Sequence, residues 1–194
     1  YDSSGNSTKE YSYTVRDYAR YIIEHPKSYT ENDVIFAKAM LNYGACAQTY
    51  WDIATDNLAN KDLDDVDRII PELTASDLEV YKASKVSNDT GTFEGYSLTL
   101  KSETTLKVYY KPALGTDINN LTFKANGQNV KPVLSGEYYT ISVENIKAWD
   151  LDTDYSFEVY DVNETLSFSC SALSYCYSVL NNSQAYPDSM IQLI

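Results

Sequence analysis

The longest amphipathic pattern of the chain lies between Asp33 and Trp51 and predicts one long helix. Six positions, all apolar or small except the last, recur there at steps of three and four residues, which places them on one face of a helix. These positions are Val34, Ala37, Leu41, Gly44, Ala45 and Gln48. Thr30 is a good N-cap candidate, with Asp33 three residues later. Residues 44–47 are small, so we expect another element to pack closely against this half of the helix.

Shorter patterns on either side predict further helices. A first helix is expected from Tyr13 to Glu24, and it should end at His25 because the residue before a proline disfavours helical angles. The first two helices should form an antiparallel hairpin. A polar, acidic connector follows from Ala54 to Asp67, and then a short helix from Ser76 to Ala83.

From Thr92 to Cys170 the apolar positions alternate with polar ones, which predicts antiparallel sheet with one buried face. Asn126-Gly127 predicts a two-residue hairpin turn. Seven short strands indicate a Greek-key sandwich of the immunoglobulin or fibronectin type, and Tyr155 is a candidate for its tyrosine corner. The strands are expected at residues 96–100, 106–110, 121–125, 130–134, 139–143, 155–159 and 166–170.

The end of the chain repeats its beginning at a constant offset of 157 residues. Thr14 falls on Ser171, Tyr18 on Tyr175, Ile22 on Val179, Tyr29 on Tyr186, and Val34 on Ile191. The repeat predicts helices after Ser171 and after Pro187, and a helical hairpin from each terminus, packed together. A second copy of the long helix would run past Ile194, so we expect the natural chain to continue.

These patterns predict an α+β fold in which an antiparallel β-sandwich is inserted between helical hairpins from both termini. Residues 1–12 are expected to be a linker or disordered, and residues 13–91 to form the helical subdomain with its connector. Residues 92–170 should form the sandwich. Residues 171–194 should be return helices that complete the helical subdomain.

The charge of the chain limits its partners. It carries 28 acidic and 15 basic side chains, a formal net charge of -13, so nucleic acid is not an expected partner. No run of about 18 apolar residues is present, so we expect no membrane span. The first residue is Tyr1, and the polar residues after it suggest a piece of a longer precursor, in which any export signal would lie upstream.

Three cysteines, Cys46, Cys170 and Cys176, cannot all pair within one chain. Buried free thiols are the plainest interpretation, although a bridge between Cys170 and Cys176 stays open. The single histidine, His25, has no cysteine pair at metal-ligand spacing, so we expect no zinc site and no cofactor.

Three stretches, residues 39–50 (AMLNYGACAQTY), 55–60 (TDNLAN) and 171–180 (SALSYCYSVL), resemble a recurrent module of large secreted or wall-attached proteins of Gram-positive anaerobic bacteria. The resemblance spans nearly the whole chain from Tyr13. It implies an exported, multidomain, extracellular protein at the cell surface and supplies no catalytic residues. Cys46 and Cys176 stand where alanine is expected, which favours buried thiols.

Two acidic loops are candidate calcium sites. Asp150, Asp152 and Asp154 alternate as in a calcium loop, but Tyr155 stands where an EF-hand needs glycine, so only a looser site remains as an alternative. The run from Asp62 to Asp67 is a second candidate for a loose calcium site. For both loops, the plainer interpretation is that the carboxylates are solvated surface charges. No pair of carboxylates stands out for catalysis, so we expect no catalytic residue.

Tyrosine is the unusual residue of this composition, with 19 copies. Tyr109, Tyr138 and Tyr160 fall on outward positions of their strands, where they could bind sugar rings or a protein partner, or pack against helices. The sequence therefore predicts a non-catalytic module that acts in binding, adhesion or spacing, with a protein or a cell-wall glycan as partner. A carbohydrate-binding module is the alternative, and an accessory domain of a glycoside hydrolase is less favoured. The oligomeric state stays open.

Overall fold

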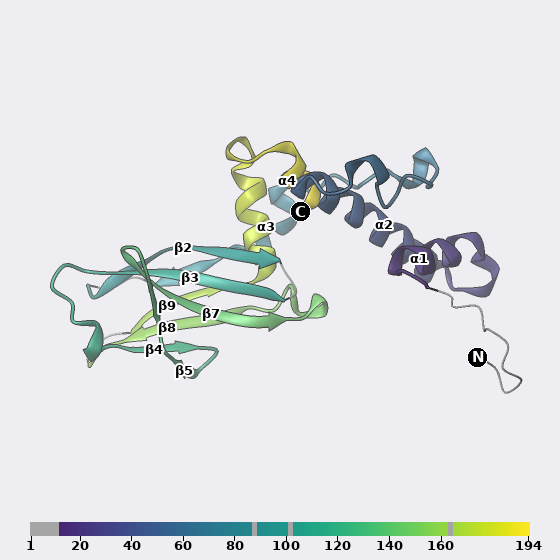
Figure 1. Ribbon diagram of the computed structural model, residues 1–194. Helices are drawn as coiled ribbons and strands as arrows, with labels where there is room; N and C mark the ends of the chain where they lie inside the picture. The colour runs from purple at the N-terminus through teal and green to yellow at the C-terminus, as the bar shows by residue number, and fades with distance from the viewer. Residues whose placement is uncertain (1–11, 87–88, 101–102, 163–164) are drawn as a thin grey trace, which may run out of the picture. The chain divides into compact units, whose positions relative to one another are not determined.

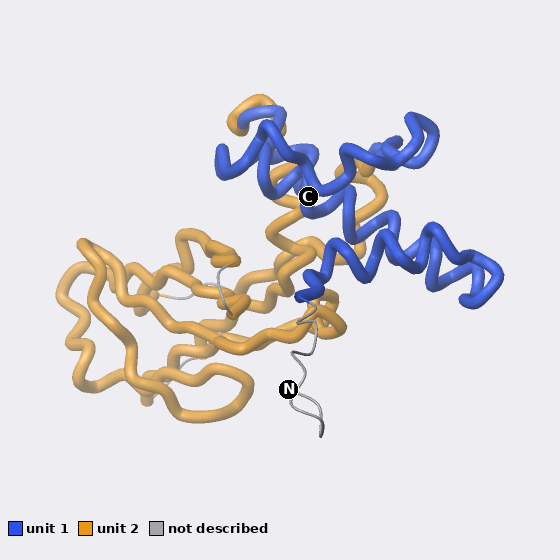
Figure 2. Tube along the Cα trace, turned by 45° about the vertical axis from the view of Figure 1, so that its right-hand side comes forward, with its two compact units in different colours: residues 1–72, 187–194 blue, residues 73–186 orange. Residues whose placement is uncertain are grey.

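The computed structural model of the protein describes residues 12–86, 89–100, 103–162 and 165–194 (Figure 1). The chain is mixed helix and sheet and divides into two compact units (Figure 2). Unit 1 is formed by residues 1–72 and 187–194, and unit 2 by residues 73–186. The segment expected to be a linker, residues 1–12, lies outside the described residues except for Ser12.

The helices of unit 1 begin at threonine caps. Helix α1 (Val15–Glu24) follows Thr14, and helix α2 (Glu31–Trp51) follows Thr30, with the 3₁₀ helix η1 (Pro26–Ser28) between them. The Thr30 hydroxyl accepts from the Asp33 N–H at 3.2 Å, and the Asp33 carboxylate accepts from the Thr30 N–H at 2.9 Å. Asp33 therefore completes the capping box, and α2 begins two residues before the start that periodicity predicts.

The core of unit 1 lies between α1, α2 and the acidic connector. Ala19 and Ile22 of α1 pack with Ala37 and Leu41 of α2, and Leu63 joins them from the connector. The connector contains two short 3₁₀ helices, η2 (Thr55–Asn57) and η3 (Asp65–Asp67). It is part of the folded unit, because Leu63 is as buried as the helical residues.

The small size of Gly44 predicts that another element packs closely against α2 there. The element that does so is the connector. A Cβ atom at Gly44 would lie 3.0 Å from the Cβ atom of Ala59. The return helix expected at this point is therefore not what Gly44 contacts. Helix α4 (Asp188–Leu193) does pack against α2 within unit 1.

The strands of unit 2 form two antiparallel sheets among the described residues. One sheet has the strand order β1-β9-β8-β4-β5 and the other β2-β3-β7-β6. The two sheets share one hydrophobic core, to which Val108 and Tyr110 contribute from the second sheet and Phe157 and Val159 from the first. The strands are β1 (Ser84–Val86), β2 (Gly91–Leu100), β3 (Thr104–Pro112), β4 (Thr122–Ala125), β5 (Gln128–Val130), β6 (Val133–Ser135), β7 (Tyr138–Ile146), β8 (Tyr155–Tyr160) and β9 (Thr165–Cys170).

Two turns decide how β4, β5 and β6 are connected. Asn126 and Gly127 both have positive φ, 50° and 73°, and join β4 to β5, which confirms the predicted hairpin. The strand expected at residues 130–134 is instead two strands in different sheets, since the chain leaves β5 at Val130 and enters β6 at Val133. Pro132 lies between them, and its missing N–H cannot continue a ladder.

Tyr155 is buried at the start of β8, as a tyrosine corner requires. Among the described residues, however, its phenol makes no hydrogen bond to the preceding loop. Burial, with Asp150 nearby, raises its pKa. The ring therefore acts as core packing, and the predicted corner hydrogen bond is not formed.

Helix α3 (Ala172–Asn181) packs against η4 (Ala75–Tyr81), a 3₁₀ helix at the place where a short helix is predicted. The hydroxyl of Ser174 donates to the carbonyl oxygen of Tyr81 at 2.5 Å, and the phenol of Tyr96 donates to the carbonyl oxygen of Ser174 at 2.8 Å. These bonds fix α3 to unit 2. The sequence pattern instead groups α3 with the helical subdomain, because a change of period marks the end of a sheet but not the partner of the next helix.

The sequence repeat is also a repeat of secondary structure. Helix α1 and α3 have corresponding bounds at the offset of 157 residues, as do η1 and η7 (Ser183–Ala185), and α4 begins where the equivalent of α2 should begin. Thr14 and Ser171 both form capping boxes. The two copies nevertheless lie in different surroundings, since α1 belongs to unit 1 and α3 to unit 2.

Candidate binding surfaces

Tyr109 and Tyr138 lie together on the outward face of the β2-β3-β7-β6 sheet. Strands β3 and β7 are antiparallel neighbours, and the register places Tyr109 opposite Thr140, next to Tyr138 on the same face. The two ring centres are 6.0 Å apart with an angle of 83° between the planes. Such an edge-to-face pair is a favourable aromatic arrangement. We name this surface the Tyr109–Tyr138 face.

Polar groups surround the two rings. The hydroxyls of Tyr109 and Ser97 are 3.1 Å apart. Lys111 Nζ lies 2.6 Å from Glu137 Oε2 and 5.7 Å from the centre of the Tyr138 ring. The hydrogen bond between Lys111 and Glu137 raises the pKa of the lysine and lowers that of the glutamate. Because both groups are exposed, water screens the pair and its contribution to stability is small.

Thr140 shows how closely this face is packed. It points outward, yet it is only 5% exposed, and its hydroxyl donates to the carbonyl oxygen of Val133 at 3.1 Å. Tyr109 and Tyr138 are themselves half-buried. The two rings are therefore packed into the surface of the sheet.

Tyr160 lies on the other sheet, apart from this pair. Its phenol donates to Glu158 Oε2 at 2.6 Å, and this hydrogen bond raises the pKa of Tyr160. Lys124 Nζ lies 4.5 Å from the centre of its ring. The two sheets share a core on their inner sides. The three tyrosines predicted to point outward therefore lie on two separate surfaces, with Tyr109 and Tyr138 on one sheet and Tyr160 on the other.

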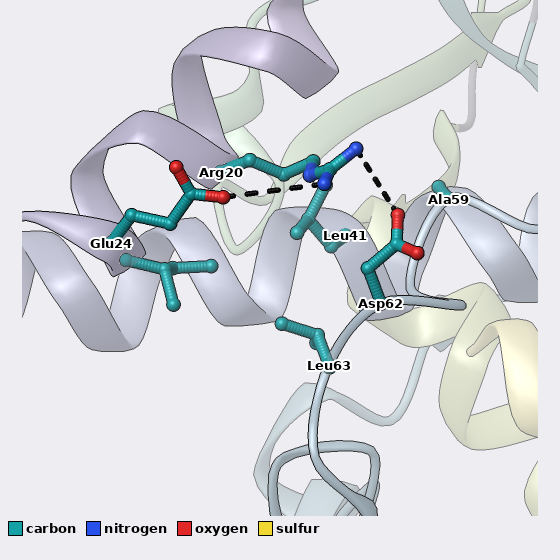
Figure 3. A pocket seen from close by; sticks show the side chains of 7 residues that line it. Arg20, Glu24, Leu41, Ala59, Asp62 and Leu63 are labelled. Carbon is teal, nitrogen blue, oxygen red and sulfur yellow. Dashed lines mark ion pairs between the residues drawn. The ribbon is translucent and has the colours of Figure 1, made fainter.

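A small pocket in unit 1 has an apolar floor and a charged rim (Figure 3). Arg20 lies between Glu24 and Asp62, and its closest carboxylate contact is 3.1 Å, to Asp62. Asp62 also lies 3.6 Å from Arg16. The lining residues are Arg20, Ile23, Glu24, Leu41, Ala59, Asp62 and Leu63.

The acidic run of the connector is used for ion pairs. Asp65 lies 3.5 Å from Arg68, and Asp67 lies 2.7 Å from Lys38. Within the described ranges, no group of three or more histidine, cysteine, aspartate or glutamate residues is placed to hold a metal ion. The structure thus lends no support to a calcium site at Asp62–Asp67 or at Asp150–Asp154.

A second hollow opens at one end of unit 2 and is acidic. Asp89, Asp117 and Asp161 line it together with hydroxyl and amide side chains. Asp117 already accepts from the backbone N–H of Asn119 at 3.0 Å. Among the described residues that line this hollow, none has a basic side chain that could bind an anionic ligand.

The motif stretches at residues 39–50 and 55–60 form one network that holds the connector to α2. Gln48 Oε1 accepts from the Ala59 N–H at 2.7 Å, and its Nε2 donates to the carbonyl oxygen of Asn57 at 3.2 Å. Asn60 Nδ2 donates to Asn42 Oδ1 at 2.9 Å, and Asn42 Nδ2 donates to the Asp67 carbonyl oxygen at 2.8 Å. Sequence reasoning missed this role, although amide side chains inside an apolar helix are a signal for it.

The three cysteines are free thiols, of which Cys46 and Cys170 are buried and Cys176 is partly buried. Burial raises the pKa of Cys170 to about 12 and that of Cys176 to about 11. A thiol with so high a pKa is a poor nucleophile near neutral pH. The cysteines therefore pack as small side chains.

None of the helices in the described part of the chain combines the length and the apolar character needed to cross a membrane. Comparisons of the sequence and the structure with protein-family models, curated proteins and solved structures give no match.

Proposed function

We propose that the chain is a non-catalytic carbohydrate-binding module of an exported bacterial surface protein, with the Tyr109–Tyr138 face as its contact surface. The observation that carries this proposal is the pair of half-buried tyrosine rings 6.0 Å apart, bordered by a hydroxyl, an ammonium and a carboxylate group. Sugar rings stack on aromatic faces, and their hydroxyls need donors and acceptors nearby.

The proposal includes an immunoglobulin-like sandwich as the scaffold. Its support is the strand order: β2-β3-β7-β6 corresponds to strands A, B, E and D, and β4, β8 and β9 to C, F and G. We also propose that α1 and α2 form a helical hairpin, since α1 packs on α2 and a short connection joins them. The outward faces of such a scaffold are free for ligands because the core uses only the inner faces.

Display at the cell surface is the second part of the proposal. It rests on the resemblance of residues 39–50, 55–60 and 171–180 to modules of secreted or wall-attached bacterial proteins. Cell-wall and surface glycans are the ligands that such a location makes accessible. The function would then be adhesion to the wall or to a neighbouring surface.

The test is binding of the purified chain to a glycan array and to isolated Gram-positive cell walls. We expect saturable binding that weakens about fivefold in Tyr109→Ala and in Tyr138→Ala, since one lost aromatic contact is worth about 1 kcal/mol. Tyr160→Ala is the matched control, because this ring lies on the other sheet and its loss should leave affinity unchanged. Absence of binding, or equal losses in all three variants, would refute the proposal.

A further inference from the structure

Helix α2 carries an exposed apolar patch between Ile35 and Tyr43. Ile35 is 57% exposed, Phe36 66% and Tyr43 53%. Ala39 is exposed between them, and Met40 is half-buried. Steps of three and four residues connect these positions, so they share one face of the helix. We name these five residues the α2 patch.

The α2 patch lies on a stretch of an acidic chain that carries little charge. Between Val34 and Trp51 the single charged residue is Lys38, which forms an ion pair with Asp67 at 2.7 Å. The chain as a whole has a net charge of -13, so most of its surfaces would repel a second copy. The α2 patch would not repel a second copy. It also has no acidic side chain that would favour a basic partner.

The repeat supplies an example of what packs on α2. Helix α4 is the repeat equivalent of the start of α2, with Ile191 at the position of Val34 and Leu193 at the position of Phe36. Helix α4 packs against α2 in unit 1. Within this chain, a helix of the α2 type therefore already docks on α2.

We propose that the α2 patch binds the α2 patch of a second copy of this chain, with the two helices antiparallel. Ala39 is the midpoint of the patch, so a two-fold axis there would place Ile35 of one copy opposite Tyr43 of the other. The small Ala39 side chains let the helices approach closely. Antiparallel helices also bring opposite ends of their macrodipoles together.

The dimer is expected to be weak. One helix pair buries less than the roughly 1,200 Å² of a standard interface, so the dissociation constant should be on the order of 100 μM. Such an affinity matters where many copies are held close together, because the local concentration then exceeds the dissociation constant.

Sedimentation velocity of the full chain between about 10 μM and 1 mM provides the first test. We expect a reversible monomer–dimer equilibrium that Phe36→Asp abolishes, since it would bury two uncompensated carboxylates. Val15→Asp is the matched control: Val15 is 68% exposed on α1, and its replacement should leave the equilibrium unchanged. A monomer at every concentration, or a dimer insensitive to Phe36→Asp, overturns the proposal.

Disulfide trapping tests the orientation without disturbing the apolar contact. Ala39→Cys should cross-link on mild oxidation, because the two Cα atoms at the axis come within disulfide reach. A mixture of Ile35→Cys and Tyr43→Cys should form the mixed dimer in preference to either homodimer. Homodimers of Ile35→Cys alone would show a parallel pair and refute the antiparallel arrangement. The unsubstituted chain controls for the native thiols.

Discussion

Replacing Ser174 by alanine tests whether one buried hydroxyl fixes α3 to unit 2. Ser174 is fully buried, and its hydroxyl accepts from the Ser171 N–H at 2.8 Å while donating to the Tyr81 carbonyl oxygen at 2.5 Å. Alanine keeps the fold of the helix and fills nearly the same volume. It removes these two bonds and the 3.1 Å hydrogen bond between the hydroxyls of Ser171 and Ser174.

The expected loss follows from the two groups left behind. Neither the Ser171 N–H nor the Tyr81 carbonyl would regain its lost bond, and a buried polar group without a partner costs about 1–3 kcal/mol. Ser174→Ala should therefore destabilise unit 2 by about 3 kcal/mol. Asp17 occupies the equivalent place in α1 but is exposed. Asp17→Ala should cost less, because water can bond the groups that it frees.

Urea unfolding, monitored by hydrogen-exchange mass spectrometry, measures the difference in stability loss between Ser174→Ala and Asp17→Ala. Exchange of peptides from α3 and η4 reports unit 2, and exchange of peptides from α1 and α2 reports unit 1. Ser174→Ala should lower protection in α3 and η4 and leave α1 unchanged. A loss below about 0.5 kcal/mol, or one no larger than that of Asp17→Ala, would show that the buried bonds are not what holds α3.

Three further predictions concern pH, thiols and a glycine. Hydrogen bonds from the N-cap residue lower the pKa of Asp33, so its contribution to stability is complete above about pH 4, the unfolded value, and is lost as the pH falls through the folded pKa. Unfolding curves of Asp33→Asn should therefore depend less on pH in this acid range than those of the original chain, and equal slopes would contradict the assignment. Because burial raises the pKa of Cys170 and Cys176, a thiol reagent at pH 8 should label them only after unfolding. Rapid labelling of either residue in the folded chain would count against their burial. A Cβ atom at Gly91 would lie 2.5 Å from a backbone oxygen of the neighbouring strand, so Gly91→Ala should cost about 1–3 kcal/mol in urea unfolding. In the same strand, Gly95→Ala meets nothing within 4 Å and is the control; similar losses in both would disprove the steric argument.

Features set by neighbouring residues were predictable from the sequence. Thr30 is the expected N-cap of α2, and Asn126-Gly127 forms the expected turn, because both depend on a few adjacent side chains. The repeat was visible for the same reason, since a helix and its cap carry their own pattern. Alternation likewise located the outward positions of Tyr109, Tyr138 and Tyr160.

Features set by distant partners were not predictable. Alternation gives the phase of a strand but not its neighbour, so it could not show that Tyr109 lies beside Tyr138 while Tyr160 lies on the other sheet. Ser171 and Ser174 resemble an exposed cap in sequence, yet they are fully buried because Tyr81 supplies an acceptor. One signal was present and not used: Pro132 marks the break between β5 and β6.

Unit 1 is formed by two segments of the chain that are separated in sequence by unit 2. This arrangement determines how the molecule would respond to mechanical force. Unit 1 takes its chain from both sides of unit 2, so tension along the polypeptide reaches the contact between α2 and α4 before it reaches the sheets. Once α4 detaches, the load enters unit 2 through η4 and α3, which lie side by side. Force would then break the bonds between η4 and α3 one after another, instead of loading all the strands at the same time. A tether built in this way would yield in two stages.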